Sequence, residues 1–160
     1  MSLKKPALDP KTLMPRNYTG YPEPYRSRVL PREKRALGDP LGLTKIGINL
    51  TTLAPGTESS MRHWHTLEEE FIFMLSGEVV LRTDAGEQVL TAGMCAGFPA
   101  SADGKSGDGH QLVNRSGAPA VYLEISNREK GDQATYPDVD LHFHGVDANP
   151  MFTRKDGSRF

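Results

Sequence analysis

The chain has 160 residues and a net charge of −1, with acidic and basic residues mixed along its length. This length suits one ordinary domain. No basic block supports nucleic-acid binding, and no apolar run is long enough to cross a membrane. We therefore expect neither a nucleic acid nor a membrane as a partner. One cysteine, Cys95, cannot build an internal disulfide framework. Because an N-terminal apolar signal region is also missing, we expect a cytoplasmic protein.

The first forty residues contain seven of the twelve prolines. Proline fixes its own φ and removes a hydrogen-bond donor, which excludes a long helix or a central strand. We therefore expect residues 1–40 to form an extended arm, with no room for a DNA-binding helix-turn-helix. The arm offers five apolar side chains that could dock on the rest of the chain, which is predicted below to form a barrel, or on a partner subunit. They are Tyr18, Tyr21, Tyr25, Val29 and Leu30.

Residues 41–130 read as short strands separated by glycine, proline and aspartate turns, which is typical of a β-sandwich or barrel. The predicted strands are 43–53, 61–65, 70–75, 78–83, 87–90, 93–98, 111–114 and 121–126. Cys95 is expected to be a small buried side chain in one of them. The segment 101–109 is rich in glycine and aspartate and predicts a loop. Residues 131–160 predict a C-terminal extension that packs on the barrel, with one late strand near 140–144.

His63 and His65 are two residues apart, so in a strand their side chains share one face, with Cα atoms about 6.5 Å apart. Two imidazoles at that spacing can converge on one metal ion. Glu70 has the wrong parity for the same strand, and a turn at 66–68 would bring it back from the adjacent strand. His110, where the glycine-rich loop enters an apolar strand, is the best-placed fourth ligand.

A plainer interpretation is that the histidine pair faces water and that residues 68–70 form a solvated acidic turn. Against it, Glu70 opens the apolar run 71–75, and a buried carboxylate is costly unless it is paired or coordinated. Ile72 and Met74 share the face of Glu70 and should point into the barrel. Phe71 and Phe73 then point outward and need a cover, either the arm or the second subunit of a homodimer.

These residues resemble two motifs of the cupin family. Residues 56–77, GTESSMRHWHTLEEEFIFMLSG, match the first motif in the spacing of the histidine pair, the glutamate and the closing glycine. Residues 93–114 resemble the second motif, although His110 follows Pro99 by eleven positions instead of five, as if 101–109 held an insertion. The resemblance implies an all-β double-stranded β-helix, or jelly roll, and a place among small single-domain bacterial cupins described as sugar-phosphate-isomerase-like.

Three imidazoles and one carboxylate suit one divalent transition metal, Mn, Fe, Ni, Zn or Cu. Such an ion keeps positions for a substrate, so we expect a metal-dependent enzyme on a small oxygenated metabolite, an isomerase or a dioxygenase. The alternative is a non-catalytic small-molecule-binding cupin module. A phosphate group would need cations, and Arg82, Lys105 and Arg115 lie near the motifs. The second histidine pair, His142 and His144, is expected on an exposed edge.

Overall fold

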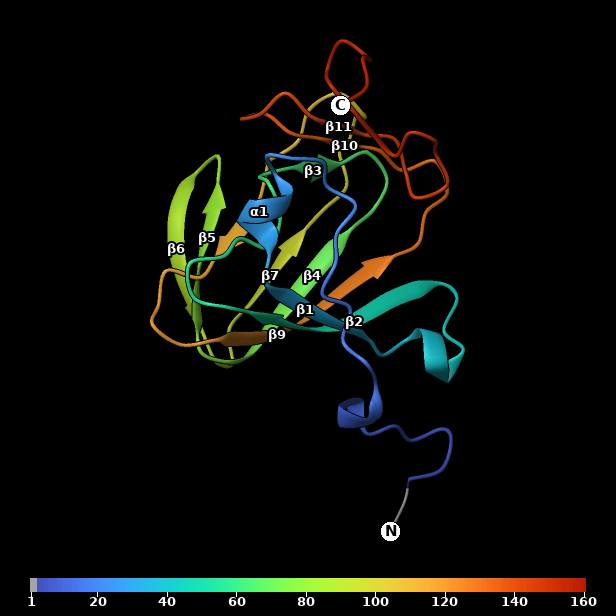
Figure 1. The fold of residues 1–160 in the computed structure, drawn as a ribbon, viewed down its shortest axis with the longest axis vertical. Coiled ribbons are helices and arrows are strands. Elements are labelled where there is room, and N and C mark those ends of the chain that lie inside the picture. The colour runs from blue at the N-terminus through green and yellow to red at the C-terminus, as the bar shows by residue number, and fades with distance from the viewer. Residues whose placement is uncertain (1–2) are drawn as a thin grey trace.

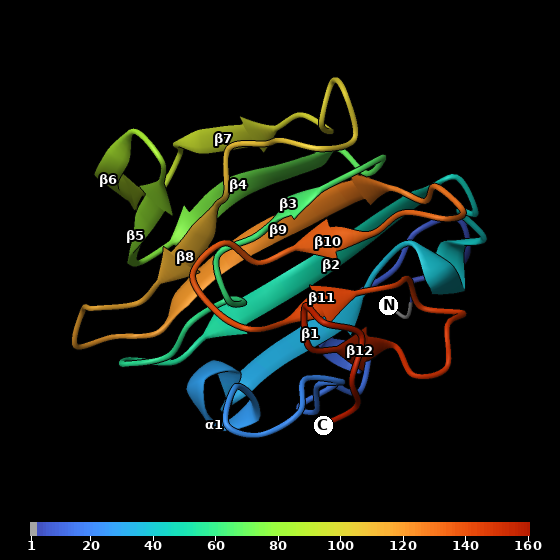
Figure 2. The same cartoon turned by 90° about the horizontal axis from the view of Figure 1, so that it is seen from above.

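Residues 3–160 are described by a computed structural model, in which antiparallel strands form three sheets (Figures 1 and 2). The five-stranded sheet has the order β1 (Arg32–Ala36), β2 (Ile46–Leu53), β9 (Ala120–Asn127), β4 (Glu70–Ser76) and β7 (Cys95–Phe98). The four-stranded sheet has the order β12 (Phe152–Thr153), β11 (His142–Phe143), β10 (Ala134–Thr135) and β3 (Trp64–His65). The three-stranded sheet has the order β6 (Gly86–Thr91), β5 (Glu78–Thr83) and β8 (Gln111–Val113).

Helical segments are short and lie in the first forty-one residues. They are η1 (Pro10–Thr12), α1 (Arg26–Val29) and η2 (Asp39–Leu41). None of the helices among residues 3–160 has the length and apolar character needed to span a membrane.

Alternation along β4 sets the inner and outer faces of the five-stranded sheet. Ile72 and Met74 are buried, whereas Phe71 and Phe73 are 39% and 37% exposed, as the sequence predicts. The buried side chains meet those of the three-stranded sheet in one core, which comprises Leu53, Ile72, Met74, Val79, Leu81, Leu90, Leu112, Ala120 and Tyr122.

The expectation that Cys95 is buried is wrong, because its side chain is exposed. Cys95 pairs with Phe73, and Ile72 pairs with Ala96, in the register of β4 with β7. Directly paired residues share a face, so Cys95 joins Phe73 outside while Ala96 packs against the core.

The arm ends in a strand of its own. β1 pairs with β2 along five residues and forms one edge of the five-stranded sheet, as Figure 2 shows. Before it, Tyr21 and Val29 are buried in a second core with Tyr136 and Leu141 of the C-terminal segment. The arm therefore docks on its own chain, and it leaves Phe71 and Phe73 uncovered.

The segment after residue 130 completes the sheet that contains β3. Ala134 pairs with His65, and Thr135 pairs with Trp64. The predicted strand 61–65 is shorter than expected, because regular pairing begins only at Trp64. His63 instead forms an isolated bridge with His110.

Candidate metal centre

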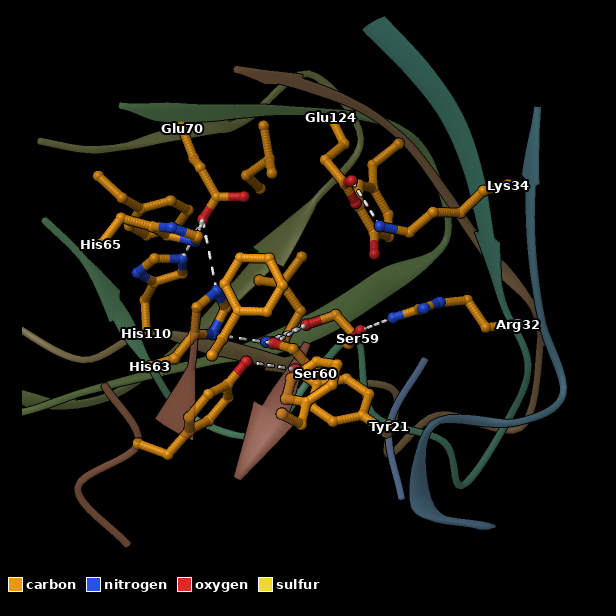
Figure 3. A pocket seen from close by; sticks show the side chains of 17 residues that line it. Tyr21, Arg32, Lys34, Ser59, Ser60, His63, His65, Glu70, His110 and Glu124 are labelled. Atoms are coloured by element: carbon orange, nitrogen blue, oxygen red, sulfur yellow. Dashed lines mark hydrogen bonds and ion pairs between the residues drawn. The ribbon is translucent and has the colours of Figure 1, made fainter. Parts of the chain in front are cut away.

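The carboxylate of Glu70 lies among three imidazoles (Figure 3). Its Oε2 atom is 2.7 Å from Nε2 of His110, 3.6 Å from Nε2 of His63 and 3.5 Å from Nε2 of His65. The structure thus brings together all four residues that the sequence singled out as metal ligands. Candidate ligand atoms of His63, Glu70 and His110 lie within 4.8 Å of one another.

Backbone pairing places these side chains. Glu70 is the first residue of β4 and shares the inner face with Ile72. The amide of His63 donates to the carbonyl of His110 at 3.1 Å, and the amide of His110 donates back at 2.8 Å. His110 therefore lies directly opposite His63 despite the long loop 101–109. The second cupin-like motif, although longer than usual, still places its histidine in the ligand group.

The Nδ1 atoms of two histidines face oxygen acceptors. His63 Nδ1 is 2.9 Å from the carbonyl of Met61, and His65 Nδ1 is 2.6 Å from Oδ2 of Asp132. An Nδ1 proton shared with these oxygens leaves the Nε2 lone pair free to coordinate. The ring of His110 is held differently, stacked on Phe98 with centroids 3.8 Å apart.

Sequence reasoning missed Asp132. Its Oδ1 accepts the backbone N–H groups of Leu67 and Glu68 at 2.8 and 3.0 Å, while Oδ2 faces His65. Atoms of His65, Glu68 and Asp132 also lie close enough to form a second ligand group. Because the carboxylate of Asp132 is already hydrogen-bonded on both oxygens, we interpret it as the residue that orients His65. It lies in a polar stretch, Gly131-Asp132-Gln133, that carries no motif.

The protonation states of His63 and Glu70 suit a metal cation. Burial lowers the pKa of His63 to about 4, so this imidazole is neutral at physiological pH. Burial alone would raise the pKa of Glu70, but hydrogen bonds with His110 and His63 hold it well below its usual range. Burial lowers the pKa of His65, but the hydrogen bond to Asp132 and the negative charges of Glu70 and Asp132 together outweigh burial and raise this pKa. Imidazole nitrogens and one carboxylate fit a divalent transition metal.

These four residues line a cavity of about 210 Å³ inside the barrel. Aromatic and aliphatic walls come from Tyr21, Ile72, Phe98, Leu112, Tyr122, Tyr136, Phe143 and Phe152, and the other polar lining residues are Arg32, Lys34, Ser59, Ser60 and Glu124.

None of the three cations near the motifs lines this cavity. Arg82 and Arg115 pair with Glu87, at 3.2 and 2.7 Å, and Lys105 is exposed. Arg32 and Lys34, which the sequence did not single out, take their place.

His142 and His144 stay apart from the site. Their rings are 4.6 Å from each other, and their Nε2 atoms lie 3.0 Å from Gln133 Oε1 and 2.7 Å from Thr153 Oγ1 respectively. Both are partly buried, which corrects the expectation of an exposed edge. The cause is that β11, which contains His142, pairs with β10 and β12, and that the amide of His144 donates to the carbonyl of Met151 at 3.0 Å.

Comparison with known proteins identifies the family. Residues 49–126 match the family model of the cupin domain. A structure from Silicibacter pomeroyi, described as a sugar phosphate isomerase from a cupin superfamily, is 38% identical. It superposes with a TM-score of 0.86 over 97% of this chain and 96% of that one. The chain belongs to the cupin superfamily, and the predicted double-stranded β-helix is confirmed.

Other similar structures extend this picture. A protein from Acidithiobacillus ferrooxidans, provisionally described as a sugar phosphate isomerase, is 30% identical. Its TM-score is 0.67 over 76% of this chain and 74% of that one. The polyketide cyclase RemF from Streptomyces resistomycificus shares the fold at 19% identity, with a TM-score of 0.63 over 79% and 81% of the two chains. No curated protein matches the sequence.

Proposed function

We propose that this cupin binds one divalent transition metal through His63, His65, Glu70 and His110 and isomerises a small oxygenated metabolite. The observation that carries the proposal is the convergence of four ligand side chains on one side of a partly open cavity in the barrel. The descriptions of the two relatives as sugar phosphate isomerases favour the isomerase over the dioxygenase. A metal held by these residues would polarise a carbonyl or hydroxyl of the substrate.

The cavity supports a small substrate. Its volume of about 210 Å³ is below the ~300–1,000 Å³ of pockets that hold drug-sized ligands. Its walls are mostly apolar, and polar groups are concentrated at the histidines and at Arg32, Lys34 and Glu124. A compact metabolite with several oxygen atoms matches this size and distribution.

Glu124 is the candidate general base. Apart from Glu70, it is the one carboxylate among residues 3–160 that lines the cavity. It pairs with Ile72 in the register of β9 with β4, so it shares the inner face of the sheet with Glu70. Its Oε1 atom accepts a hydrogen bond from Lys34 at 2.5 Å, which holds the carboxylate in place. Isomerisation next to a carbonyl needs a proton carrier, and Glu124 would take and return that proton.

The Glu124→Gln variant tests this role. We expect kcat to fall at least ~100-fold while metal content stays that of the unmodified protein, because the amide cannot accept the proton. The measurement is the interconversion of a panel of aldose and ketose phosphates by metal-loaded protein. Glu87→Gln, at an exposed position away from the cavity, is the matched control.

Two other outcomes would redirect the proposal. Dioxygen consumption by an Fe²⁺-loaded sample, without isomerisation, would instead support the dioxygenase. Tight ligand binding without turnover would support the non-catalytic binding module. The ion pair with Lys34 is the observation that favours that module, because a neighbouring cation stabilises the charged carboxylate of Glu124 and makes it a weaker base.

We also propose a cytoplasmic homodimer. The exposed lone thiol of Cys95 suits a reducing compartment. Phe71 borders a groove on the outer face of the sheet, together with Ile46, Pro99 and Ile125. A second copy of the chain would cover these apolar side chains, which the arm leaves exposed.

A further inference from the structure

Two cations from the arm line the cavity of the proposed metal centre. Arg32 and Lys34 are two positions apart on β1 and therefore share one face, which is the inner face of the sheet. In Figure 3 they lie on the side of the cavity away from His65 and Glu70. Both precede the segment 49–126 that matches the cupin family model.

Metal binding changes the sign of the charge around the cavity. Arg32 and Lys34 contribute two positive charges, Glu70 and Glu124 contribute two negative ones, and the buried carboxylate of Asp132 behind His65 adds a third negative charge. A divalent ion beside neutral imidazoles raises the sum from −1 to +1. Excess charge in a buried site is costly unless an ion of opposite sign joins it. The metal-loaded cavity is therefore matched to an anion.

Unused hydrogen-bond donors lie in the same wall. Arg32 Nε and the hydroxyl of Tyr122 are buried and have no hydrogen-bond partner within residues 3–160. The two residues are 8% and 1% exposed. The Nη1 atom of Arg32 donates to the carbonyl of Ser59, which fixes the guanidinium. Buried donors without a partner are uncommon and call for one.

Arg32 differs in this respect from Arg115 and Arg62. Arg115 forms two hydrogen bonds of 2.7 Å with the carboxylate of Glu87, and Arg62 binds Asp138 through two nitrogens. The one hydrogen bond described for the side chain of Arg32 goes to a neutral carbonyl. Arg32 is thus a buried guanidinium without a carboxylate partner among the described residues 3–160, and guanidinium groups bind carboxylate and phosphate oxygens strongly.

We propose that the cavity binds a small substrate through an anionic carboxylate or phosphate group held by Arg32 and Tyr122, with the rest of the molecule facing the four metal ligands. The inference rests on the proposed function, because the metal supplies the uncompensated charge. It assigns the arm a direct part in substrate recognition.

Calorimetric titration of the Mn²⁺-loaded protein tests the charge preference. Glycolate is compared with the neutral glycolamide, and glycerol phosphate with glycerol. We expect at least one anion to bind ~10-fold or more tightly than its neutral partner, because a charge-assisted hydrogen bond is about twice as strong as a neutral one. A preference in the first pair identifies the anionic group as a carboxylate, and a preference in the second pair identifies it as a phosphate.

Two variants locate the preference. Arg32→Gln keeps a donor for the carbonyl of Ser59 but loses the charge, and we expect anion affinity to fall ~10- to 100-fold. Tyr122→Phe removes a hydroxyl that forms no hydrogen bond with the part of the chain that the structure describes, so thermal stability should stay the same or rise while anion affinity falls about fivefold. Arg115→Gln, outside the cavity, should bind anions as the unmodified protein does.

The inference is overturned if metal-loaded protein binds the anions no better than their neutral partners, or if both variants bind them unchanged. Manganese content is measured in the same samples. Full loading without anion preference would refute this inference and leave the proposed metal centre standing. If no metal can be loaded, the proposed function fails and the inference fails with it.

Discussion

Asp132 links the proposed metal centre to the C-terminal segment. Its carboxylate contacts Nδ1 of His65 on one side and two backbone amides of the turn at 67–68 on the other. A carboxylate in this position fixes the ring orientation and makes Nε2 a better ligand. Asp132 lies beyond the segment 49–126 that matches the cupin family model, so this chain supplies part of its site from outside that segment.

The Asp132→Asn variant should bind the metal ~10- to 100-fold more weakly. The amide oxygen can still accept the N–H groups of Leu67 and Glu68, so the turn persists, while the negative charge beside His65 is lost. Titration against a competing chelator measures the affinity. Asp103→Asn, in the exposed loop, is the control. Equal affinity in the unmodified protein and Asp132→Asn would show that this carboxylate does not support the metal.

The arm and the C-terminal segment stabilise each other. Val29 is fully buried and packs in the second core with Tyr21, Tyr136 and Leu141. A few residues later, β1 completes the edge of the five-stranded sheet and brings Arg32 and Lys34 into the cavity. Docking of the arm is therefore coupled to the shape of the site.

The Val29→Ala variant should lower the free energy of unfolding by about 1–3 kcal/mol, because it leaves a cavity between the two segments. Urea denaturation followed by circular dichroism measures the change. Met14→Ala, at a side chain that is 88% exposed, should stay within about 0.5 kcal/mol of the unmodified protein. No loss of stability in Val29→Ala would mean that the arm is not anchored in solution.

Short-range patterns predict β4 and its faces well, because apolar residues occupy both faces of the strand and the acidic run 68–70 ends where the strand begins. The spacing of His63 and His65 likewise singles out the pair locally, although the bridge with His110 places His63 in the structure. Arg32 and Lys34 lie in the charged strand Arg32–Ala36, whose sequence REKRA carries no apolar alternation. Asp132 meets His65 across 67 residues of sequence. Both depend on long-range pairing, which local patterns do not encode.

The outer face of the five-stranded sheet is the surface through which we expect two copies to associate. Phe71 and Phe73 project from β4 there, and Cys95 lies beside Phe73. Large apolar side chains gathered on one face of a sheet mark an interaction site more often than scattered ones do.

Sedimentation velocity should show a dimer at micromolar concentration for the unmodified protein and a monomer for the double variant Phe71→Glu with Phe73→Glu. The two introduced carboxylates would have to lose their hydration in the dimer interface, which is costly. Val89→Glu, exposed on the separate sheet that contains β6, should remain dimeric. A monomeric unmodified protein at this concentration would contradict the proposal.

Elemental analysis tests the central claim most directly. Protein purified without chelator, and then loaded with Mn²⁺, Fe²⁺, Ni²⁺, Zn²⁺ or Cu²⁺ in turn, should hold one ion per chain for at least one of these metals. Glu70→Gln and His110→Gln should lose that ion, whereas His142→Gln, outside the site, should keep it. Absence of metal from the unmodified protein under every loading condition, or equal metal content in all three variants, would contradict the account.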